Sequence, residues 1–317
     1  DGTARIWTPD GKFIAYVGHD FTDDTFYEQK LYFMSRDGAN VKEIASNLDR
    51  TPERLFWALD GKGIYFNASD RGTRNLYFTA LNDKVSPVTK GNHLLTASDI
   101  DRAGRVVATL SAPQQPGDVV TFSLKTPVQI NKLTAVNDDV MHGLKLGEVE
   151  EILYKSVDNF DIQGWIVKPP DFDASKKYPL ILSIHGGPHA MFNVGFNFGW
   201  QYYAAKGYVV LYTNPRGSSG YGSAFGNAIK NSYPGKDYDD LMKGVDQVIG
   251  RDYIDEKNLF VYGGSGGGVL TAWIVGHTDR FAAASSNFPV INWLSFVGTT
   301  DGASWYRNFK KLPWEDP

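Results

Sequence analysis

The glycine-rich stretch around Ser265 carries the residues that could do chemistry. The pentapeptide Gly-Gly-Ser-Gly-Gly at 263–267 follows an apolar run at 259–262 and precedes a second one that begins at Val269. It fits G-x-S-x-G, a pattern typical of a sharp strand-to-helix turn that presents a serine hydroxyl at the end of a sheet. Glycines are needed there because side chains on the neighbours of the serine would collide with the returning helix. We therefore interpret Ser265 as a candidate nucleophile.

A loop that cradles a phosphate is the main alternative for the same stretch, because strand, glycine-rich turn and helix also begin a dinucleotide site. The G-x-G-x-x-G pattern needs a glycine at position 269 or 271, where Val269 and Thr271 stand. The G-x-x-x-x-G-K-[ST] pattern is absent from the sequence. The phosphate alternative therefore fits poorly, and the loops elsewhere in the chain must decide.

Composition excludes several classes of function. The chain has 317 residues, of which 42% are hydrophobic and 21% charged, so it is long enough for two globular domains. A net charge of −4 argues against a nucleic-acid or anionic-membrane partner, and the apolar runs are far shorter than the ~20 residues of a membrane span. Cysteine is absent, which excludes disulfides, thiolate catalysis and cysteine-based metal sites. We expect neither a metal nor a cofactor, and we leave compartment and homo-oligomerisation open.

Residues 1–145 carry a β-rich repeat. The pattern Trp-x-x-Asp-Gly-Lys at 7–12 returns after 50 residues at 57–62, and a fainter copy at 101–105 follows the second after 43. Asp-Gly turns, alternating strands and a period in the forties are typical of propeller blades. We predict a partial β-propeller of about three blades, with an ordinary antiparallel sandwich as the alternative. His19 and His93 are isolated in this half, and we interpret them as loop or packing residues.

Residues 146–317 change pattern. A hairpin at 150–156 and 162–167 is followed by alternating strand-like and helix-like segments. The predicted strands are 180–184, 208–213, 259–262 and 281–286, and the predicted helices are 199–205, 238–249 and 267–275. Such alternation indicates a mostly parallel sheet with helices on both faces, whose site lies beyond the carboxyl ends of the strands.

Three loops meet at that edge of the predicted sheet. They are His-Gly-Gly-Pro at 185–188, Asn-Pro-Arg-Gly-Ser-Ser-Gly-Tyr-Gly at 214–222, and the serine turn. Glycines in the first loop let backbone N–H groups turn toward an incoming oxygen, as in loops that supply half of an oxyanion hole. The His-Gly-Gly-Pro and G-x-S-x-G motifs in this order, each after a strand, indicate a serine nucleophile far more specifically than either motif alone.

With these motifs, residues 185–317 resemble the catalytic domain of the prolyl oligopeptidase family of serine peptidases, in particular its acylaminoacyl-peptidase and bacterial dipeptidyl-aminopeptidase branch. The matching pieces also include YDDLMKGVDQVI at 238–249, GGSGGG at 263–268, HTDRF at 277–281 and PWE at 313–315. The resemblance implies an α/β-hydrolase domain over 146–317, preceded by a propeller that admits short peptides rather than folded proteins.

The same resemblance assigns roles to residues. Ser265 matches the nucleophile, and the backbone N–H groups of Gly187 and Gly266 match the two oxyanion donors. Family members commonly carry a large residue, often Tyr, directly after the serine. With Gly266 in that place, we expect a less rigid turn and a substrate pocket that lacks one wall.

Residues around these loops are expected to play supporting roles. We predict that Arg216 braces the loops. Asp239 and Asp240 stand at the predicted start of a helix, where carboxylates favour the helix dipole. An aromatic segment after the last predicted strand could line a pocket for an apolar substrate side chain, with ordinary packing as the alternative. Its candidate pocket residues are Trp293, Phe296 and Trp305.

The groups that would activate Ser265 are not found. A serine nucleophile needs a histidine base oriented by a carboxylate, and in this fold the order is Ser, Asp, His. His277 lies twelve residues along the predicted helix, which places it ~18 Å away at 1.5 Å per residue. Asp279 and Asp301 follow no predicted strand that would aim them at a histidine. The family resemblance implies that the activating Asp and His lie beyond Pro317. We therefore expect a chain truncated at both ends and inefficient alone.

The sequence as a whole indicates a serine peptidase that hydrolyses short peptides through an acyl-enzyme on Ser265. Aminopeptidase, acylaminoacyl-peptidase and oligopeptidase types stay open. The alternatives are a carboxylesterase on the same fold, which the β-rich repeat argues against, and a non-catalytic propeller-bearing binding protein.

Overall fold

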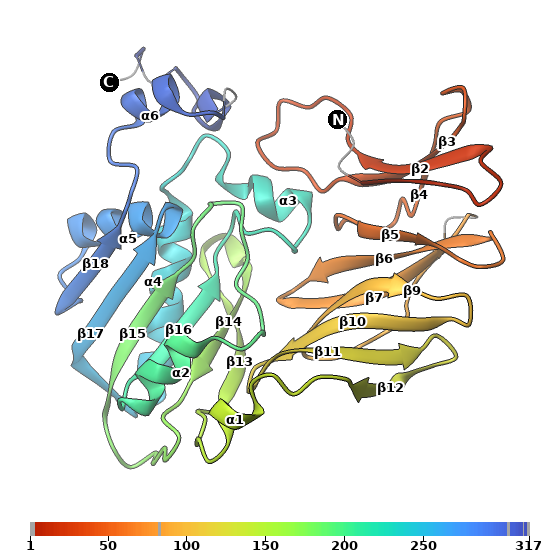
Figure 1. Ribbon diagram of the computed structural model, residues 1–317. Coiled ribbons are helices and arrows are strands. Elements are labelled where there is room, and N and C mark those ends of the chain that lie inside the picture. Colours follow the sequence, from red (N-terminus) through yellow and green to blue (C-terminus); the bar gives the residue numbers. More distant parts are fainter. Residues whose placement is uncertain (1–3, 82–83, 303–304, 313, 316–317) are drawn as a thin grey trace.

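The computed structural model of the protein describes residues 4–81, 84–302, 305–312 and 314–315. Its strands form three sheets (Figure 1). Two mainly antiparallel sheets belong to the first half of the chain, and one mixed sheet belongs to the second. No helix in the described ranges is long and apolar enough to cross a membrane.

The first half consists of three similar units of four strands, each strand pairing antiparallel with the next. The first unit is β1 (Ala4–Trp7), β2 (Phe13–Gly18), β3 (Lys30–Ser35) and β4 (Lys42–Ile44). The second is β5 (Glu53–Trp57), β6 (Gly63–Asp70), β7 (Thr73–Ala80) and β8 (Val85–Pro87). The third is β9 (Leu94–Ile100), β10 (Arg105–Ala112), β11 (Gln115–Ser123) and β12 (Thr126–Lys132). A parallel pairing of β7 with β9 joins the second and third units into one sheet.

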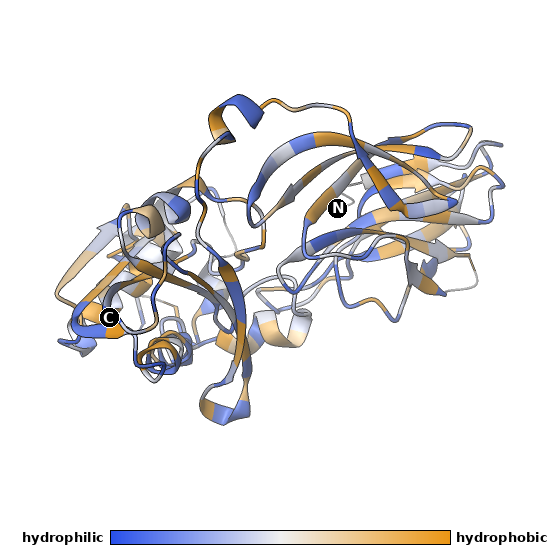
Figure 2. Cartoon of the chain, turned by 90° about the horizontal axis from the view of Figure 1, so that it is seen from below, coloured by the Kyte–Doolittle hydropathy of each residue, from blue (hydrophilic) through white to orange (hydrophobic). Residues whose placement is uncertain are grey.

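The repeated sequence motif occupies the same turn in each unit, between its first and second strands. Gly11, Gly61 and Gly104 have φ of 69°, 67° and 76°, which glycine adopts without strain. In each turn an aspartate oxygen accepts a backbone N–H two residues further on. Hydrophobic and hydrophilic residues alternate along the strands (Figure 2), as in the alternately buried and exposed residues of β10. The grouping of these units into a propeller, and the boundary at residue 145, stay predictions.

The second half is built on a six-stranded sheet in the order β13-β14-β16-β15-β17-β18. The helix α1 (Asp138–Met141) precedes it. An antiparallel hairpin comes first, formed by β13 (Val149–Lys155), η1 (Val157–Asn159) and β14 (Asp161–Val167). The parallel strands are β15 (Tyr178–Ile184), β16 (Val209–Asn214), β17 (Ile254–Gly264) and β18 (Ala283–Asn287). The predicted hairpin and the predicted mostly parallel sheet are both confirmed.

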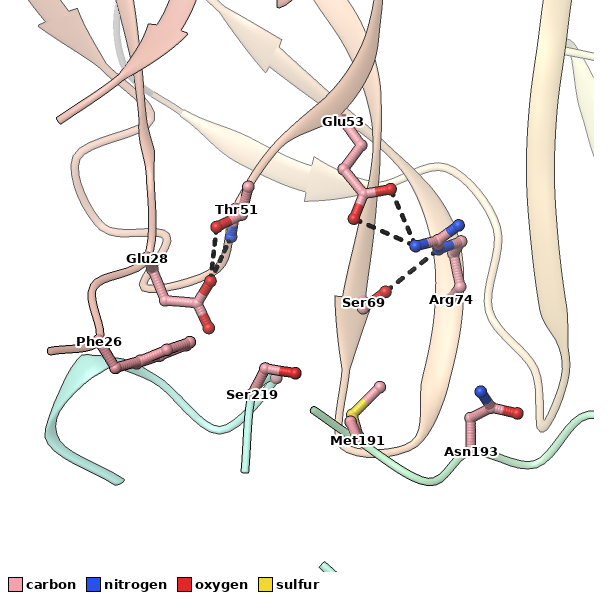
Figure 3. A pocket seen from close by; sticks show the side chains of 10 residues that line it. Phe26, Glu28, Thr51, Glu53, Ser69, Arg74, Met191, Asn193 and Ser219 are labelled. Carbon is pink, nitrogen blue, oxygen red and sulfur yellow. Dashed lines mark hydrogen bonds and ion pairs between the residues drawn. The ribbon is translucent and has the colours of Figure 1, made fainter. Parts of the chain in front are cut away.

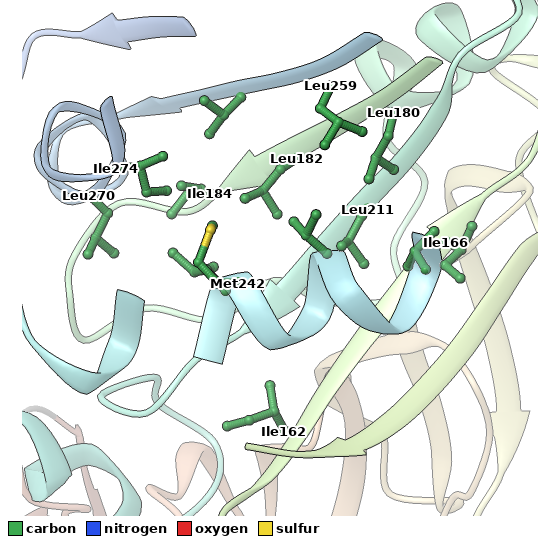
Figure 4. Close-up of a cluster of buried hydrophobic side chains, with 14 of the residues drawn as sticks. Ile162, Ile166, Leu180, Leu182, Ile184, Leu211, Met242, Leu259, Leu270 and Ile274 are labelled. Atoms are coloured by element: carbon green, nitrogen blue, oxygen red, sulfur yellow. The ribbon is translucent and has the colours of Figure 1, made fainter. Parts of the chain in front are cut away.

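Helices cover both faces of this sheet, as the near-continuous apolar strands require. The helices are α2 (Phe198–Ala205), α3 (Ser223–Gly226), η2 (Asn227–Ile229), α4 (Lys236–Ile249), α5 (Gly266–His277), α6 (Trp293–Thr299) and η3 (Trp305–Asn308). Along β16, Val209 and Leu211 join the core cluster under α4 and α5, whereas Val210 and Tyr212 pack with Trp200 of α2. Successive residues of β16 thus point to opposite faces of the sheet, and all of them are buried. Figure 4 shows the core cluster on the face that α4 and α5 cover.

Candidate active site

Ser265 stands in the one-residue turn between β17 and α5, and it is exposed. Its φ of 55° and ψ of −120° are unusual for a residue with a side chain, and such strain persists only where the surroundings hold it. Its N–H donates to the carbonyl of Asn287 at 3.0 Å, and its carbonyl accepts from the N–H of Val269 at 3.0 Å. Its Oγ has no hydrogen-bond partner within the described ranges. The backbone is therefore fixed while the hydroxyl stays free.

Close approach explains the glycines that follow the serine. A Cβ on Gly266 would lie 2.8 Å from the carbonyl oxygen of Gly187, and one on Gly268 would lie 2.5 Å from that of Asn287. A Cβ on Gly267 would collide with the carbonyl oxygen of Ile184. Real Cβ atoms do not approach backbone oxygens this closely. The first turn of α5 thus packs against the ends of β15 and β18, the two strands that flank β17, and only glycine permits this close approach.

The loop 185–188 brings Gly187 to the serine turn. Gly187 has a φ of 119°, which side chains rarely adopt, and its N lies 3.0 Å from the point where a Cβ of Gly266 would be. A Cβ on Gly186 would lie 3.4 Å from the Cβ of Ser265. The structure therefore brings together the three residues predicted to act, Ser265, Gly187 and Gly266. Their catalytic roles stay predictions.

Two histidines hold this loop against the loop 214–222. His185 has its Nε2 3.0 Å from Ser218 Oγ and its Nδ1 2.6 Å from the carbonyl oxygen of Gly186. His189 has its Nδ1 2.9 Å from the carbonyl oxygen of Gly217. Burial lowers the pKa of both imidazoles, which favours the neutral rings. Both rings are engaged in holding loops, so neither is placed to serve Ser265 as a base.

Arg216 braces the base of the site, as the sequence predicts. Its guanidinium donates to both carboxylate oxygens of Asp240 at 2.8 and 2.9 Å, to Asp158 at 3.1 Å and to the carbonyl of Val157 at 3.0 Å. The assignment of Asp240 to a helix-start role is wrong, because this carboxylate is fully buried against Arg216. Asp239, in contrast, does lie in the first turn of α4.

Of the other four histidines, three contact neighbouring groups, and the fourth, His142, follows α1 and is exposed. His277 ends α5, where its Nδ1 lies 2.7 Å from the carbonyl oxygen of Trp273 and its ring stacks on the Trp273 indole. His93 contacts Asn75 and His19 contacts the backbone of Asp20. Within the described residues no histidine forms an ion pair with a carboxylate. The part of the chain that the structure describes also holds no cluster of three or more potential metal ligands.

The aromatic segment adjoins a cavity of about 730 Å³, which we call the Trp293 cavity. Its lining includes Trp293, Tyr233 and Phe309. Phe296 and Trp305 do not line it but pack behind Trp293, with ring centroids 6.0 and 5.9 Å away. Of the three predicted pocket residues, only Trp293 therefore faces this cavity.

A second cavity, of about 350 Å³, lies between the two halves of the chain (Figure 3); we call it the Glu28 cavity. Glu28, Glu53 and Arg74 line it from the first half, and Met191 and Ser219 line it from the second. Glu53 and Arg74 form an ion pair at 2.8 Å. The Glu28 cavity was not foreseen, because its residues lie far apart in the sequence and no motif marks them.

Glu28 is the notable group in this cavity. The residue is buried, with 9% of its surface exposed. One oxygen, Oε2, accepts the N–H and the hydroxyl of Thr51 at 2.9 and 2.7 Å, whereas Oε1 is buried without a partner in the described chain (Figure 3). A buried carboxylate oxygen without a donor is costly, so Oε1 has capacity to accept a further hydrogen bond.

Comparison with known proteins agrees with the motifs. Residues 194–317 match the family described as "Prolyl oligopeptidase family". The chain belongs to the prolyl oligopeptidase family. It is 38% identical over 251 residues to an uncharacterised peptidase of Bacillus subtilis, covering 78% of this chain and 38% of that protein. It is 33% identical over 313 residues to dipeptidyl-peptidase 5 of Trichophyton equinum, covering 94% and 42%.

Solved structures of prolyl oligopeptidase-family proteins share the fold. The acylaminoacyl peptidase of Pyrococcus horikoshii superposes with a TM-score of 0.85 at 26% identity, covering 97% of this chain and 48% of that one. Dipeptidyl peptidase 4 of Porphyromonas gingivalis superposes with a TM-score of 0.77 at 21% identity, covering 98% and 44%. The α/β-hydrolase domain of the family is thus present, and the chain spans about two fifths of the length of the curated relatives it matches.

Proposed function

We propose that the full-length protein is a serine peptidase whose acyl-enzyme forms on Ser265. The observation that carries the proposal is the strained, exposed Ser265 with the Gly187 backbone seated against Gly266. Family membership supports a peptidase, and the close approach of Gly187 to Gly266 beside Ser265 supports the assignment of their N–H groups to the oxyanion hole.

In the proposed reaction Ser265 Oγ adds to the carbonyl carbon of a peptide bond. The tetrahedral intermediate collapses with cleavage of the C–N bond, and the serine proton is delivered to the departing amine. Water then adds to the ester and releases the acid, which restores the hydroxyl. Proton transfer requires a histidine oriented by a carboxylate. We assign both groups to parts of the full-length protein outside this chain, because the histidines nearest to Ser265 in the motifs and along α5, His185, His189 and His277, are engaged elsewhere.

We also propose that the substrate carries a free amino terminus, which binds in the Glu28 cavity. Arg74 and Glu53 neutralise each other, so Glu28 gives this cavity a net negative charge. An ammonium group would supply the donor that Glu28 Oε1 lacks. The name of the Trichophyton relative, a dipeptidyl-peptidase, points the same way.

The spacing of the two sites suits a short substrate. Met191 lines the Glu28 cavity and follows Gly187 by four residues, which span at most about 14 Å when extended. This short stretch of chain between the two sites suits a peptide whose amino terminus lies a few residues from the scissile bond. The Trp293 cavity adjoins the serine turn through Tyr233, and we assign it to an apolar side chain beside that bond.

We further propose that the three four-stranded units are blades of a β-propeller, stacked beside the site. Such a propeller would restrict entry and favour short peptides over folded proteins. The repeated turn geometry supports this assignment, and so do the direct contacts between the halves. Asp49 accepts from the N–H and hydroxyl of Ser223 at 3.0 and 2.9 Å, and the N–H of Arg71 donates to Gly220 at 3.0 Å.

The test combines a covalent probe with a substrate panel. A fluorophosphonate should label the full-length protein at Ser265, located by peptide mass mapping, and Ser265→Ala should abolish the adduct. Chromogenic dipeptidyl amides with a free amine should be hydrolysed at least tenfold faster than their N-acetylated counterparts. If the fluorophosphonate does not label Ser265 in the full-length protein, the assignment of Ser265 as the nucleophile is wrong. Turnover of simple esters without turnover of any peptide amide would favour a carboxylesterase instead.

A further inference from the structure

The first three carbonyls of α5 each accept a hydrogen bond from a side-chain hydroxyl. The phenol of Tyr233 donates to Gly266 at 3.2 Å, the hydroxyl of Thr271 to Gly267 at 2.8 Å, and the hydroxyl of Ser286 to Gly268 at 2.8 Å. The donors come from three segments of the chain: the loop before α4, α5 itself, and β18. The start of this helix is therefore held from several directions.

Three glycines make such support necessary. Glycine is the poorest helix former apart from proline, because its backbone has the most freedom to lose. The three positions cannot carry a side chain, since the strand ends and the Gly187 backbone lie too close. Hydroxyl donors from neighbouring segments restrict the turn without adding atoms to it.

We propose that Tyr233 is a positioning residue that holds Gly266, and with it the N–H directed at the oxyanion. Gly266 has no Cβ, so its two backbone torsions are restrained only by its neighbours. The Gly187 backbone contacts it on one side, and the Tyr233 phenol fixes its carbonyl. The Tyr233 phenol holds the peptide plane that follows Gly266. The plane that precedes it, which carries the Gly266 N–H, is held through the Ser265 carbonyl, which accepts from the N–H of Val269 at 3.0 Å. The inference rests on the proposed function, because it assigns a purpose to that oxyanion N–H.

The surroundings of Tyr233 suit this role. Its side chain is buried, and burial raises the pKa of its phenol, so the O–H stays protonated and able to donate. Its ring lines the Trp293 cavity and meets the Trp293 indole edge-on, with centroids 6.0 Å apart. One residue thus contacts both the serine turn and the cavity assigned to the substrate side chain.

The test is Tyr233→Phe in the full-length protein, which keeps the ring and removes only the donor. We expect kcat and the rate of fluorophosphonate labelling to fall about three- to tenfold, the range for one net hydrogen bond. KM should change less than twofold, because the cavity keeps its wall. Tyr238→Phe is the matched control: its ring lies at the start of α4 beside His277, and both rates should stay at the wild-type level.

The outcomes separate this inference from the proposed function. If wild-type protein is labelled at Ser265 and Tyr233→Phe reacts at the same rate, the positioning role is wrong while the nucleophile stands. If KM rises and kcat does not change, Tyr233 serves only as a cavity wall and the inference is also wrong. If wild-type protein is not labelled, the proposed function itself fails. Equal melting temperatures for both variants would exclude a general loss of folding as the cause of a slower rate.

Discussion

The serine turn and the Glu28 cavity differ in the kind of atoms that form them. The turn consists of backbone and glycines, and the side chains that support it are neutral hydroxyls. The cavity consists of side chains, and three of those that line it are charged. The turn depends on the lack of side chains at its glycines, whereas the cavity depends on its charged side chains.

This difference determines how each site can be damaged. The turn tolerates no added atom, because a Cβ on Gly266, Gly267 or Gly268 would lie less than 3.0 Å from the backbone of 184–187 or of Asn287. The cavity can accept a change of shape, but its proposed selectivity depends on the unpaired oxygen of Glu28. Steric variants should therefore disable the turn, and charge variants should alter the cavity.

The largest effect is expected from a single methyl group at the turn. In Gly266→Ala the new Cβ would lie 2.8 Å from the carbonyl oxygen of Gly187, so the two backbones must separate. We expect kcat to fall about 10²- to 10³-fold, as when one oxyanion donor is lost. Gly276→Ala is the matched control, because it lies on the same helix and its Cβ would meet nothing within 4 Å. Wild-type kcat for Gly266→Ala would show that the close approach is dispensable.

A smaller, substrate-dependent effect is expected from a charge change in the cavity. In Glu28→Gln the amide oxygen can still accept from Thr51, while an NH₂ group replaces the unpaired oxygen. Loss of a charge-assisted bond should lower kcat/KM about 10- to 100-fold for free-amine dipeptidyl amides and leave N-acetylated ones unchanged.

The control for this charge change is Glu43→Gln, which removes a carboxylate from the same half of the chain. Glu43 pairs with Lys30 at 2.9 Å and does not line the cavity. Its substitution should leave the preference for free amines intact. If Glu28→Gln lowers kcat/KM equally for free-amine and N-acetylated substrates, Glu28 does not bind the substrate amine and has a structural role instead.

The same difference explains what the sequence could predict. The turn could be located because its constraint is local: five consecutive residues encode a strained serine with no room for neighbouring side chains. The parallel sheet and the hairpin could be predicted because buried strands read as apolar runs. The Glu28 cavity could not, since Glu28, Arg74 and Ser219 meet only through the packing of the two halves. Asp240 was misassigned for a similar reason: its partner, Arg216, lies 24 residues away.

The smallest effect on catalysis is expected from Asp237→Asn, which tests whether the support of the turn is uncharged. Asp237 accepts the N–H groups of Gly235 and Tyr238 through Oδ1, and its Oδ2 is buried without a partner in the described chain. Burial raises the pKa of this carboxyl to about 7 from 3.8. The native state therefore holds a proton that the unfolded state loses, and wild-type stability should fall as pH rises from about 4 to 7.

An asparagine keeps the Oδ1 acceptor and cannot ionise, so the variant should gain stability relative to wild type as pH rises through this window. The gain should level off above pH 7 at no more than about 4 kcal/mol, because one pKa unit corresponds to about 1.4 kcal/mol. Urea unfolding at pH 5 and pH 8 measures it, with kcat expected within twofold of wild type. Asp239→Asn removes a charge from the same helical turn and should leave the wild-type pH slope in place. An Asp237→Asn protein that follows that slope would mean that the carboxylate is already ionised near Tyr233, which supports the turn, and the contrast between a neutral turn and a charged cavity would fail.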